Sequence, residues 1–297
     1  MKLLNAMPPY NLFGIEDQNY EKAKVVVLPV PYDSTTTYKT GARDGPHAII
    51  DASRNLEFFT EELEQDISKL GIYTTEELAP NLDSPEKTID SIEKEVTLLL
   101  GDSKMPLLLG GEHSIAIGSI RAVSKKYKKN FSVLHFDAHS DSRDEYMGSK
   151  YCHACVMARA REVCNSCFSI GLRSTEEEGY RKHRNTTIYR KDMHNRSTDD
   201  IVDELVKNIA ENVYISVDVD VMDPSFMPST GTPEPDGLSF YELTSIIKGV
   251  LSKKKLVGAD FSELSPIGGF VAPNFTVAKL ILLTLGYAYY TSKWSVG

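Results

Sequence analysis

The chain has 297 residues, of which 41% are hydrophobic and 25% charged, the composition of an ordinary globular protein with a large core. Its net charge of −9 argues against nucleic acid as a partner, because phosphate binding needs clustered Lys and Arg. Residues 1–14 lack the apolar run of a secretory signal, and the longest apolar stretch, 277–290, is too short for a membrane span. We therefore expect a cytoplasmic protein that binds neither nucleic acid nor a membrane.

Short apolar or β-branched runs alternate with longer segments of helical periodicity along the whole chain. The predicted strands are residues 24–28, 106–109, 132–136, 167–172, 213–217 and 255–261. The predicted helices are residues 46–53, 85–100, 114–127, 198–211, 239–251 and 274–290. This alternation predicts an α/β protein with a mainly parallel sheet covered on both faces. Since no repeat or linker interrupts the pattern, we expect one domain over residues 1–297 rather than two.

Polar residues follow three of the predicted strands at the point where each strand ends, which is where open α/β sheets bind ligands. The segments are G-G-E-H-S at 110–114, D-A-H-S-D at 137–141 and D-V-D at 218–220. Residues two apart along an extended strand end point the same way, so the polar residues of each segment share a face. Together they offer two imidazoles and four carboxylates, carried by His113, Asp137, His139, Asp141, Asp218 and Asp220.

Four carboxylates gathered at low dielectric repel one another, and two divalent cations would cancel their charges. Imidazole and carboxylate ligands together suit manganese, nickel, zinc or iron better than calcium. The excess of oxygen over nitrogen ligands favours manganese. A hydroxide that bridges two such ions is a nucleophile at neutral pH. The sequence therefore predicts a binuclear metal site with hydrolytic chemistry.

A lone D-x-D motif is usually a solvated turn, but three polar motifs on separate strand ends of one chain favour a functional site. An EF-hand loop from Asp218 is excluded because Met222 and Asp223 occupy positions that require an acidic or Asn ligand and a Gly. A two-metal phosphoesterase is disfavoured because the chain has no G-N-H run. His135 lies one step deeper on the strand before Asp137, and we interpret it as a core or supporting histidine rather than a ligand.

The four cysteines lie in one short window and form two C-x-x-C pairs: Cys152, Cys155, Cys164 and Cys167. Such pairs suggest a zinc or iron–sulfur site. The intervening residues 154–163 have a helical pattern, and ten helical residues would hold the pairs roughly 15 Å apart. We therefore expect buried or incidental thiols rather than a metal cluster.

In G-G-E-H-S (110–114), D-A-H-S-D (137–141) and S-V-D-V-D-V-M-D-P (216–224) the sequence resembles the ureohydrolase family of arginases and agmatinases. The segments G-A-R-D-G-P-H-A-I (41–49) and G-T-P-E-P-D-G-L-S (231–239) are similar to agmatinase segments. The resemblance implies a single three-layer α/β/α domain, two Mn²⁺ ions per chain and a homotrimer or homohexamer. It also implies the release of urea from a guanidino compound.

The resemblance further implies a role for each site residue. Asp137 and Asp218 would bridge the two ions. His113 and Asp141 would complete one ion site. His139 and Asp220 would complete the other.

Three residues have implied catalytic roles. Asp141 would also accept a hydrogen bond from the bridging hydroxide. Glu263, in D-F-S-E-L-S-P (260–266), would pair with the guanidinium, because a carboxylate fixes the plane of that group. His153, in Y-C-H-A-C (151–155), would shuttle a proton to the leaving amine. Many agmatinases have S-H-G-T at this last segment, so the wall of the pocket beside His153 departs from the family pattern.

Agmatine, cleaved to putrescine and urea, is the predicted substrate. Residues 142–146 are closer to the agmatinase pattern than to the Asn-containing run of arginases, and Asp144 and Glu145 would suit a terminal ammonium. An inward-facing Arg143 would instead favour a carboxylate such as guanidinobutyrate, while Glu176 to Glu178 are interpreted as a solvated charge run. Arginine remains an alternative, as do a catalytically silent metal-binding regulatory protein of the same fold and a metal-dependent deacylase.

Overall fold

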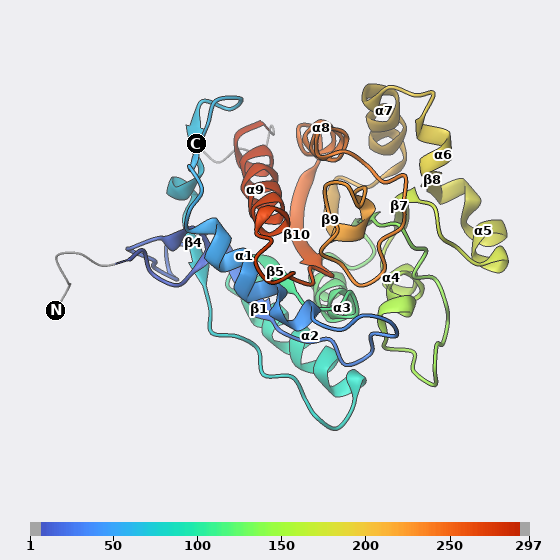
Figure 1. Ribbon diagram of the computed structural model, residues 1–297, viewed down its shortest axis with the longest axis horizontal. Coiled ribbons are helices and arrows are strands. Elements are labelled where there is room, and N and C mark those ends of the chain that lie inside the picture. The colour runs from blue at the N-terminus through green and yellow to red at the C-terminus, as the bar shows by residue number, and fades with distance from the viewer. Residues whose placement is uncertain (1–6, 292–297) are drawn as a thin grey trace.

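The computed structural model describes residues 7–291 and centres on an eight-stranded sheet in which all paired strands are parallel (Figure 1). The strand order is β4-β1-β5-β10-β9-β6-β7-β8. The strands are β1 (Val25–Val30), β4 (Ile72–Thr74), β5 (Met105–Gly110), β6 (Ser132–Phe136), β7 (Ser166–Leu172), β8 (Thr187–Tyr189), β9 (Asn212–Asp218) and β10 (Lys255–Ser262). A separate small hairpin pairs β2 (Phe59–Thr60) with β3 (Gln65–Asp66).

Helices cover both faces of this sheet. One face packs against α1 (Gly45–Ser53), α6 (Arg190–Met193), α7 (Thr198–Asn208), α8 (Phe240–Leu251) and α9 (Ala272–Gly286). The other face packs against α2 (Pro85–Gly101), α3 (Ile115–Tyr127) and α4 (Val156–Val163). The remaining helical segments are α5 (Glu177–His183), the 3-10 turns η1 (Leu12–Gly14), η2 (Ala42–Asp44), η3 (Ile67–Leu70), η4 (His153–Cys155), η5 (Arg184–Thr186) and η6 (Val219–Val221), and the π-helical turn η7 (Tyr287–Thr291).

The strands are apolar on both sides, and their side chains alternate between the two helical layers. On β9, Val213, Ile215 and Val217 enter the core under α7, α8 and α9, whereas Tyr214 enters the core under α2, α3 and α4. All four side chains are fully buried. This confirms the predicted three-layer α/β/α architecture with a parallel sheet.

All six predicted strands and all six predicted helices are present, with ends shifted by a few residues. Prediction missed the edge strands β4 and β8, which are three residues long and too short to show a pattern. The helix predicted over 198–211 ends at Asn208, because Ile209 is extended and the N–H of Ala210 donates to the Ser132 hydroxyl. Within residues 7–291 no helix is long and apolar enough to span a membrane.

The four central strands place the polar segments beside one another. In the order β5-β10-β9-β6 they are adjacent and parallel, so their carboxyl ends meet at one edge of the sheet. His113 follows β5, Glu263 follows β10, Asp218 ends β9 and Asp137 follows β6. The strand order therefore brings together residues that are up to 150 positions apart in sequence.

Gly111 closes the junction between β5 and the loop after β1, and its substitution tests this junction. A Cβ at Gly111 would lie 1.9 Å from the carbonyl oxygen of Tyr32, so Gly111→Ala must displace backbone. We expect a loss of about 3 kcal/mol in the free energy of unfolding, the upper range for an overpacked site. Gly101→Ala is the matched control, because its Cβ meets nothing within 4 Å at the end of α2 and should stabilise slightly. Denaturant titration of both variants is the measurement, and an unaffected Gly111→Ala would contradict this account.

Candidate metal centre and active site

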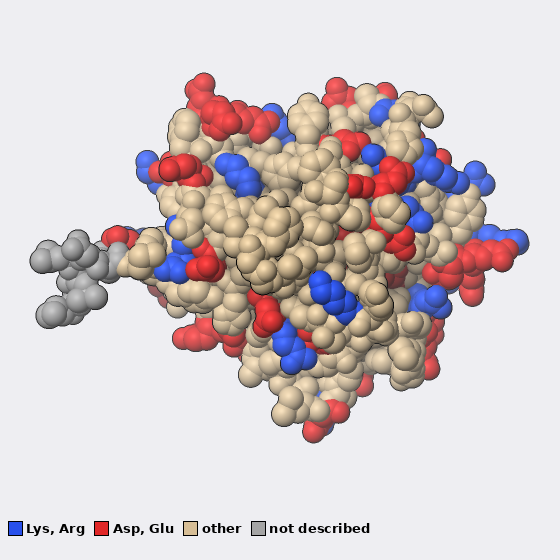
Figure 2. All heavy atoms as spheres, viewed as in Figure 1, with Lys and Arg blue, Asp and Glu red and all other residues tan. Residues whose placement is uncertain are grey.

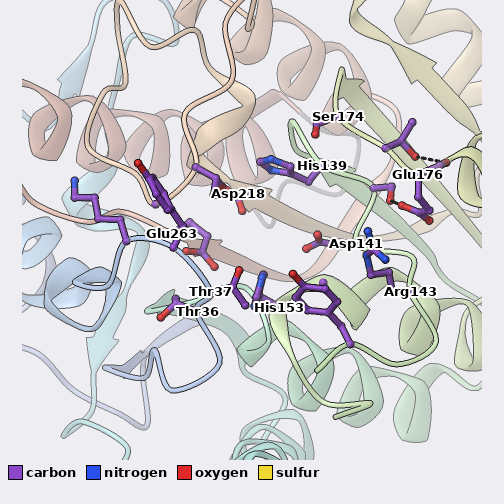
Figure 3. A pocket seen from close by; sticks show the side chains of 18 residues that line it. Thr36, Thr37, His139, Asp141, Arg143, His153, Ser174, Glu176, Asp218 and Glu263 are labelled. Atoms are coloured by element: carbon purple, nitrogen blue, oxygen red, sulfur yellow. Dashed lines mark hydrogen bonds between the residues drawn. The ribbon is translucent and has the colours of Figure 1, made fainter. Parts of the chain in front are cut away.

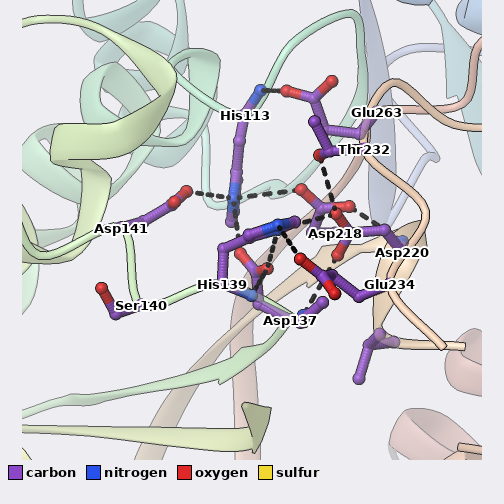
Figure 4. A network of polar contacts seen from close by, with 12 residues as sticks. His113, Asp137, His139, Ser140, Asp141, Asp218, Asp220, Thr232, Glu234 and Glu263 are labelled. Carbon is purple, nitrogen blue, oxygen red and sulfur yellow. Dashed lines mark hydrogen bonds and ion pairs between the residues drawn. The ribbon is translucent and has the colours of Figure 1, made fainter. Parts of the chain in front are cut away.

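Six polar side chains from three strand ends converge on the carboxyl edge of the sheet (Figure 4). Asp137 lies at their centre and is fully buried. Its Oδ2 lies 3.2 Å from His113 Nδ1, and its Oδ1 lies 3.6 Å from His139 Nδ1. One carboxylate therefore faces both imidazoles, each with a different oxygen.

The other three carboxylates surround these imidazoles. His113 Nδ1 lies 3.1 Å from Asp141 Oδ2 and 3.7 Å from Asp218 Oδ2. His139 Nδ1 lies 2.9 Å from Asp220 Oδ2. All six side chains whose convergence the sequence predicts are therefore close together.

Within the described part of the chain, the potential ligand atoms fall into two clusters that share Asp137. One cluster holds His113, His135, Asp137 and Asp141, and the other holds Asp137, His139 and Asp220, with ligand atoms within 4.8 Å of one another in each. Neither contains a cysteine. Asp218 was expected to bridge as Asp137 does, but its Oδ1 accepts the backbone N–H of Asp220 at 2.9 Å and only Oδ2 faces His113.

His135 supports the cluster through both ring nitrogens. Its Nε2 lies 2.7 Å from Asp137 Oδ2 and its Nδ1 lies 3.0 Å from Ser169 Oγ. Its ring stacks on that of His113, with centroids 5.3 Å apart. Because both nitrogens are engaged, His135 orients Asp137 and His113 rather than offering a free lone pair.

The local backbone differs from the extended strand ends that we expected. Only Asp218 still belongs to its strand, and residues Val219–Val221 form the 3-10 turn η6. The carboxylate of Asp137 accepts the N–H of His139 at 2.5 Å, as that of Asp218 accepts the N–H of Asp220. These turns, closed by an Asp side chain and the N–H two residues on, point alternate side chains into one site.

A buried relay fixes the tautomer of His113. The hydroxyl of Ser216 donates to Asp260 Oδ1 at 3.0 Å and lies 2.8 Å from His113 Nε2. Since this hydroxyl already donates to Asp260, it accepts from Nε2–H, so the neutral ring has its lone pair on Nδ1, toward the cluster. Prediction missed Ser216 and Asp260. Their polar side chains within otherwise apolar strands were the available signal.

The charges of the cluster are strongly unbalanced. Burial raises the pKa of Asp218, and the charges of Asp220 and Asp137 raise it further. Burial and the charge of Asp137 also raise the pKa of Asp220. Burial would lower the pKa of His139, but Asp220 and Asp137 outweigh it and raise that pKa to about 12. Buried carboxylates that repel one another, beside two imidazoles, are a donor set that fits a pair of divalent cations.

A cavity of about 330 Å³ opens beside the cluster (Figure 3). Asp141, Asp218 and His139 form its wall on the side of the cluster, and Glu263 and His153 also line it. Glu263 has a positive φ of 66°, a strained conformation for this residue. Its Oε1 accepts the N–H of His113 at 2.7 Å, which turns the carboxylate toward the cavity.

The loop after β1 supports the opposite wall of this cavity. Asp33 is buried and holds the loop closed by accepting from the N–H of Gly41 and from the guanidinium of Arg43. Thr35 donates its N–H and hydroxyl to the buried carboxylate of Glu112, at 2.6 and 2.5 Å. The Thr35 hydroxyl also accepts the N–H of His153. The prediction included none of Asp33, Thr35 and Glu112 among the site residues.

The acidic residues near the cavity differ in part from expectation. Asp144 binds Arg159 and Lys150 and does not line the cavity, so its predicted contact with an ammonium is wrong. Glu176 was interpreted as part of a solvated charge run but lines the cavity, where it accepts from the Ser140 hydroxyl at 2.8 Å. Figure 3 shows Glu176 and Glu263 on opposite sides of the cavity.

Arg143 is exposed at the rim of the same cavity, which it also lines. Its guanidinium carbon lies 5.1 Å from the ring centroid of Tyr146. The guanidinium thus stacks on an aromatic face, and no carboxylate within residues 7–291 forms an ion pair with it.

Known proteins are similar to this chain in sequence and in fold. The model of the arginase family matches residues 23–285. An N(1)-aminopropylagmatine ureohydrolase of Thermus thermophilus is 36% identical over 284 residues, which cover 95% of this chain and 96% of that protein. The agmatinase of Pyrococcus horikoshii is 35% identical over 282 residues, which cover 93% of this chain and 97% of that protein.

Among solved structures, the agmatine ureohydrolase of Thermoplasma volcanium superimposes with a TM-score of 0.84 at 34% identity, covering 91% of this chain and 92% of that one. An arginase from Medicago truncatula gives a TM-score of 0.79 at 25% identity, covering 90% and 88%. The similarity of this chain to these enzymes, in sequence and in fold, is thus consistent with the buried His and Asp clusters at the carboxyl edge of the sheet. The chain belongs to the arginase family and is a ureohydrolase, an enzyme that hydrolyses amidine C–N bonds to release urea.

Proposed function

We propose that the protein hydrolyses agmatine to putrescine and urea. The observation that carries this proposal is the pair of carboxylates on opposite sides of the cavity, Glu263 beside the metal centre and Glu176 away from it. Agmatine has a guanidinium at one end and an ammonium at the other. A carboxylate at each end suits this dication better than arginine or guanidinobutyrate, whose far-end carboxylate would meet the negative charge of Glu176.

The metal ligands in this proposal are His113, Asp137, His139, Asp141, Asp218 and Asp220. Bound divalent cations would polarise the guanidinium and lower the pKa of water to the neutral range. Asp141 would also accept a hydrogen bond from the attacking water, because it faces both His113 and the cavity.

Glu263 and His153 act on the substrate itself. The Glu263 oxygen that does not accept from His113 would accept from the guanidinium and fix its plane for attack. His153 lines the same cavity, with its backbone held by Thr35, and would pass a proton to the leaving amine.

The finer features of the proposal concern the cations and the assembly. Manganese fits four carboxylates with two imidazoles. We also propose one catalytic domain over residues 1–297, assembled as a homotrimer or homohexamer in the cytoplasm. The four unpaired and buried cysteines support a reducing compartment.

N(1)-aminopropylagmatine is a second candidate substrate. It is favoured by 36% identity over 95% of the chain to the Thermus thermophilus enzyme, whose name specifies agmatine extended by an aminopropyl group. Its additional cationic nitrogen would extend past Glu176 toward the open rim of the cavity.

Urea release from a substrate panel tests the proposed function. The panel is agmatine, N(1)-aminopropylagmatine, arginine and guanidinobutyrate, each given to manganese-loaded protein. We expect the highest kcat/KM with agmatine and little urea from the two carboxylate-bearing compounds. A higher value with the aminopropyl compound would select the second candidate. No urea from any of the four would contradict the proposal and favour a silent metal-binding protein.

Neutral substitutions of Glu263 and of Glu176 should change the kinetics of hydrolysis in different ways. Glu263→Gln should lower kcat/KM at least about 100-fold, because the guanidinium loses its orienting partner. Glu176→Gln should raise the KM for agmatine about 5-fold with kcat unchanged, since a half-exposed ion pair contributes about 1 kcal/mol. Steady-state kinetics of the two variants are the measurement. Equal effects of both substitutions on kcat would show that the two ends of the cavity are assigned wrongly.

A further inference from the structure

Two thiols that the proposed reaction does not use lie on either side of His153. The sulfur atoms of Cys152 and Cys155 are 3.1 Å apart, and both residues are buried. Cys152 immediately precedes η4 and Cys155 is its last residue, and this single turn carries His153 and leads into α4. His153 and Ala154, the two residues between them, line the substrate cavity.

The backbone already holds these sulfurs in position. The N–H of Cys155 donates to the carbonyl of Cys152 at 3.0 Å and closes the turn. Both thiols also face the carbonyl oxygen of Ser149, at 3.8 Å from Cys152 and 3.6 Å from Cys155. An S–S bond is about 2.05 Å long, so the sulfurs need to approach by only about 1 Å to form one.

We propose that Cys152 and Cys155 form a reversible disulfide by exchange with a low-molecular-weight disulfide, and that this bond slows hydrolysis in the adjacent cavity. The thiolate of Cys155 attacks one sulfur of the small disulfide and releases one small thiol. Cys152, once deprotonated, then displaces the second small thiol and closes the protein disulfide. The protein dithiol is oxidised and the small disulfide is reduced to two thiols, so electrons and protons balance.

The electrostatic environment agrees with Cys155 as the attacking thiol. The hydrogen bond from Cys152 lowers the pKa of Cys155, and burial opposes this only in part. A thiol whose pKa is lowered is present as thiolate more often near neutral pH.

An exposed turn covers the two sulfurs and gives access to them. The backbones of Tyr146 and Ser149 pair with each other at 2.9 and 3.0 Å, and Met147 between them is 80% exposed. Gly148 has a positive φ, and a Cβ built on it would meet no atom within 4 Å. Such a sparsely packed turn opens locally at low cost, and opening removes the Ser149 carbonyl from both thiols.

The same turn couples the disulfide to the cavity, and this part of the inference rests on the proposed function. A disulfide has no S–H group, so oxidation removes the thiol hydrogen bonding to the Ser149 carbonyl, which also accepts the N–H of Tyr146. The ring of Tyr146, in the same turn, lies edge-on to the ring of His153 with centroids 6.0 Å apart. Loosening of the turn therefore disturbs the side chain proposed to protonate the leaving amine.

The second C-x-x-C pair is an internal control with the same spacing. Cys164 donates to the carbonyl of Ser166 and Cys167 to the sulfur of Met157, both at 3.3 Å. Both cysteines lie in the hydrophobic core that α4 covers. Burial raises the pKa of Cys164 to about 12 and also raises that of Cys167.

Thiol mapping of the full-length, manganese-loaded protein tests the proposal. The protein is incubated with glutathione disulfide, alkylated, and analysed by peptide mass and by urea release. We expect the peptide with Cys152 and Cys155 to be unalkylated and lighter by two hydrogens than its reduced form. We expect Cys164 and Cys167 to be alkylated. We expect kcat to fall about 10-fold or more, as for a misplaced catalytic group, and to recover with a phosphine reductant.

Paired serine variants assign the response to one C-x-x-C pair. The Cys152→Ser/Cys155→Ser protein should be active and unaffected by glutathione disulfide, whereas Cys164→Ser/Cys167→Ser should respond as the parent does. The proposal is overturned if the parent keeps Cys152 and Cys155 alkylated or carries only glutathione adducts, or if its disulfide leaves kcat unchanged. Absence of urea from the reduced parent would refute the proposed function alone, because peptide mass tests the disulfide independently of activity.

Discussion

The site depends on the burial of more negative charge than its imidazoles can neutralise. Asp137 is fully buried with one oxygen toward each of two imidazoles. Burial raises the pKa of Asp218 and of Asp220, and the charge of Asp137 raises both further. Uncompensated carboxylates at this depth would cost several kcal/mol each. A pair of divalent cations would remove this cost and would supply hydrolytic chemistry. The same charges that are costly to bury together thus give the cluster affinity for metal.

The rest of the fold holds these charges in place. The parallel strands place the polar segments at the carboxyl edge of the sheet. Short turns closed by Asp side chains orient the polar side chains toward the site. The guanidinium of Arg173 donates to the carbonyls of Asp220 and Glu234, and so ties the D-V-D turn to the loop that borders the cavity. Asp33 does the same for the loop on the other side, through Gly41 and Arg43. Polar side chains outside the ligand set therefore stabilise the walls of the site.

Much of this was predictable because the pattern is local. Apolar runs that end in Asp or His show both the strand and its functional end, so the six strands and the convergence of the six polar side chains follow from sequence. What could not be predicted depends on distant partners. Ser216 resembles any strand serine until Asp260 and His113 are beside it. Glu176 and Asp144 are equally acidic in sequence, and only folding directs one to the cavity and the other to Arg159.

The number of metal ions bound by Asp137 and His139 variants tests the central claim most directly. Parent protein, Asp137→Ala and His139→Ala would be loaded with Mn²⁺, passed over a desalting column and analysed for metal per chain. The shared position of Asp137 predicts two ions for the parent, about one for His139→Ala and fewer than one for Asp137→Ala, since removing the shared carboxylate weakens both sites. Equal metal content in the two variants, or a single ion in the parent, would contradict a binuclear centre built around Asp137.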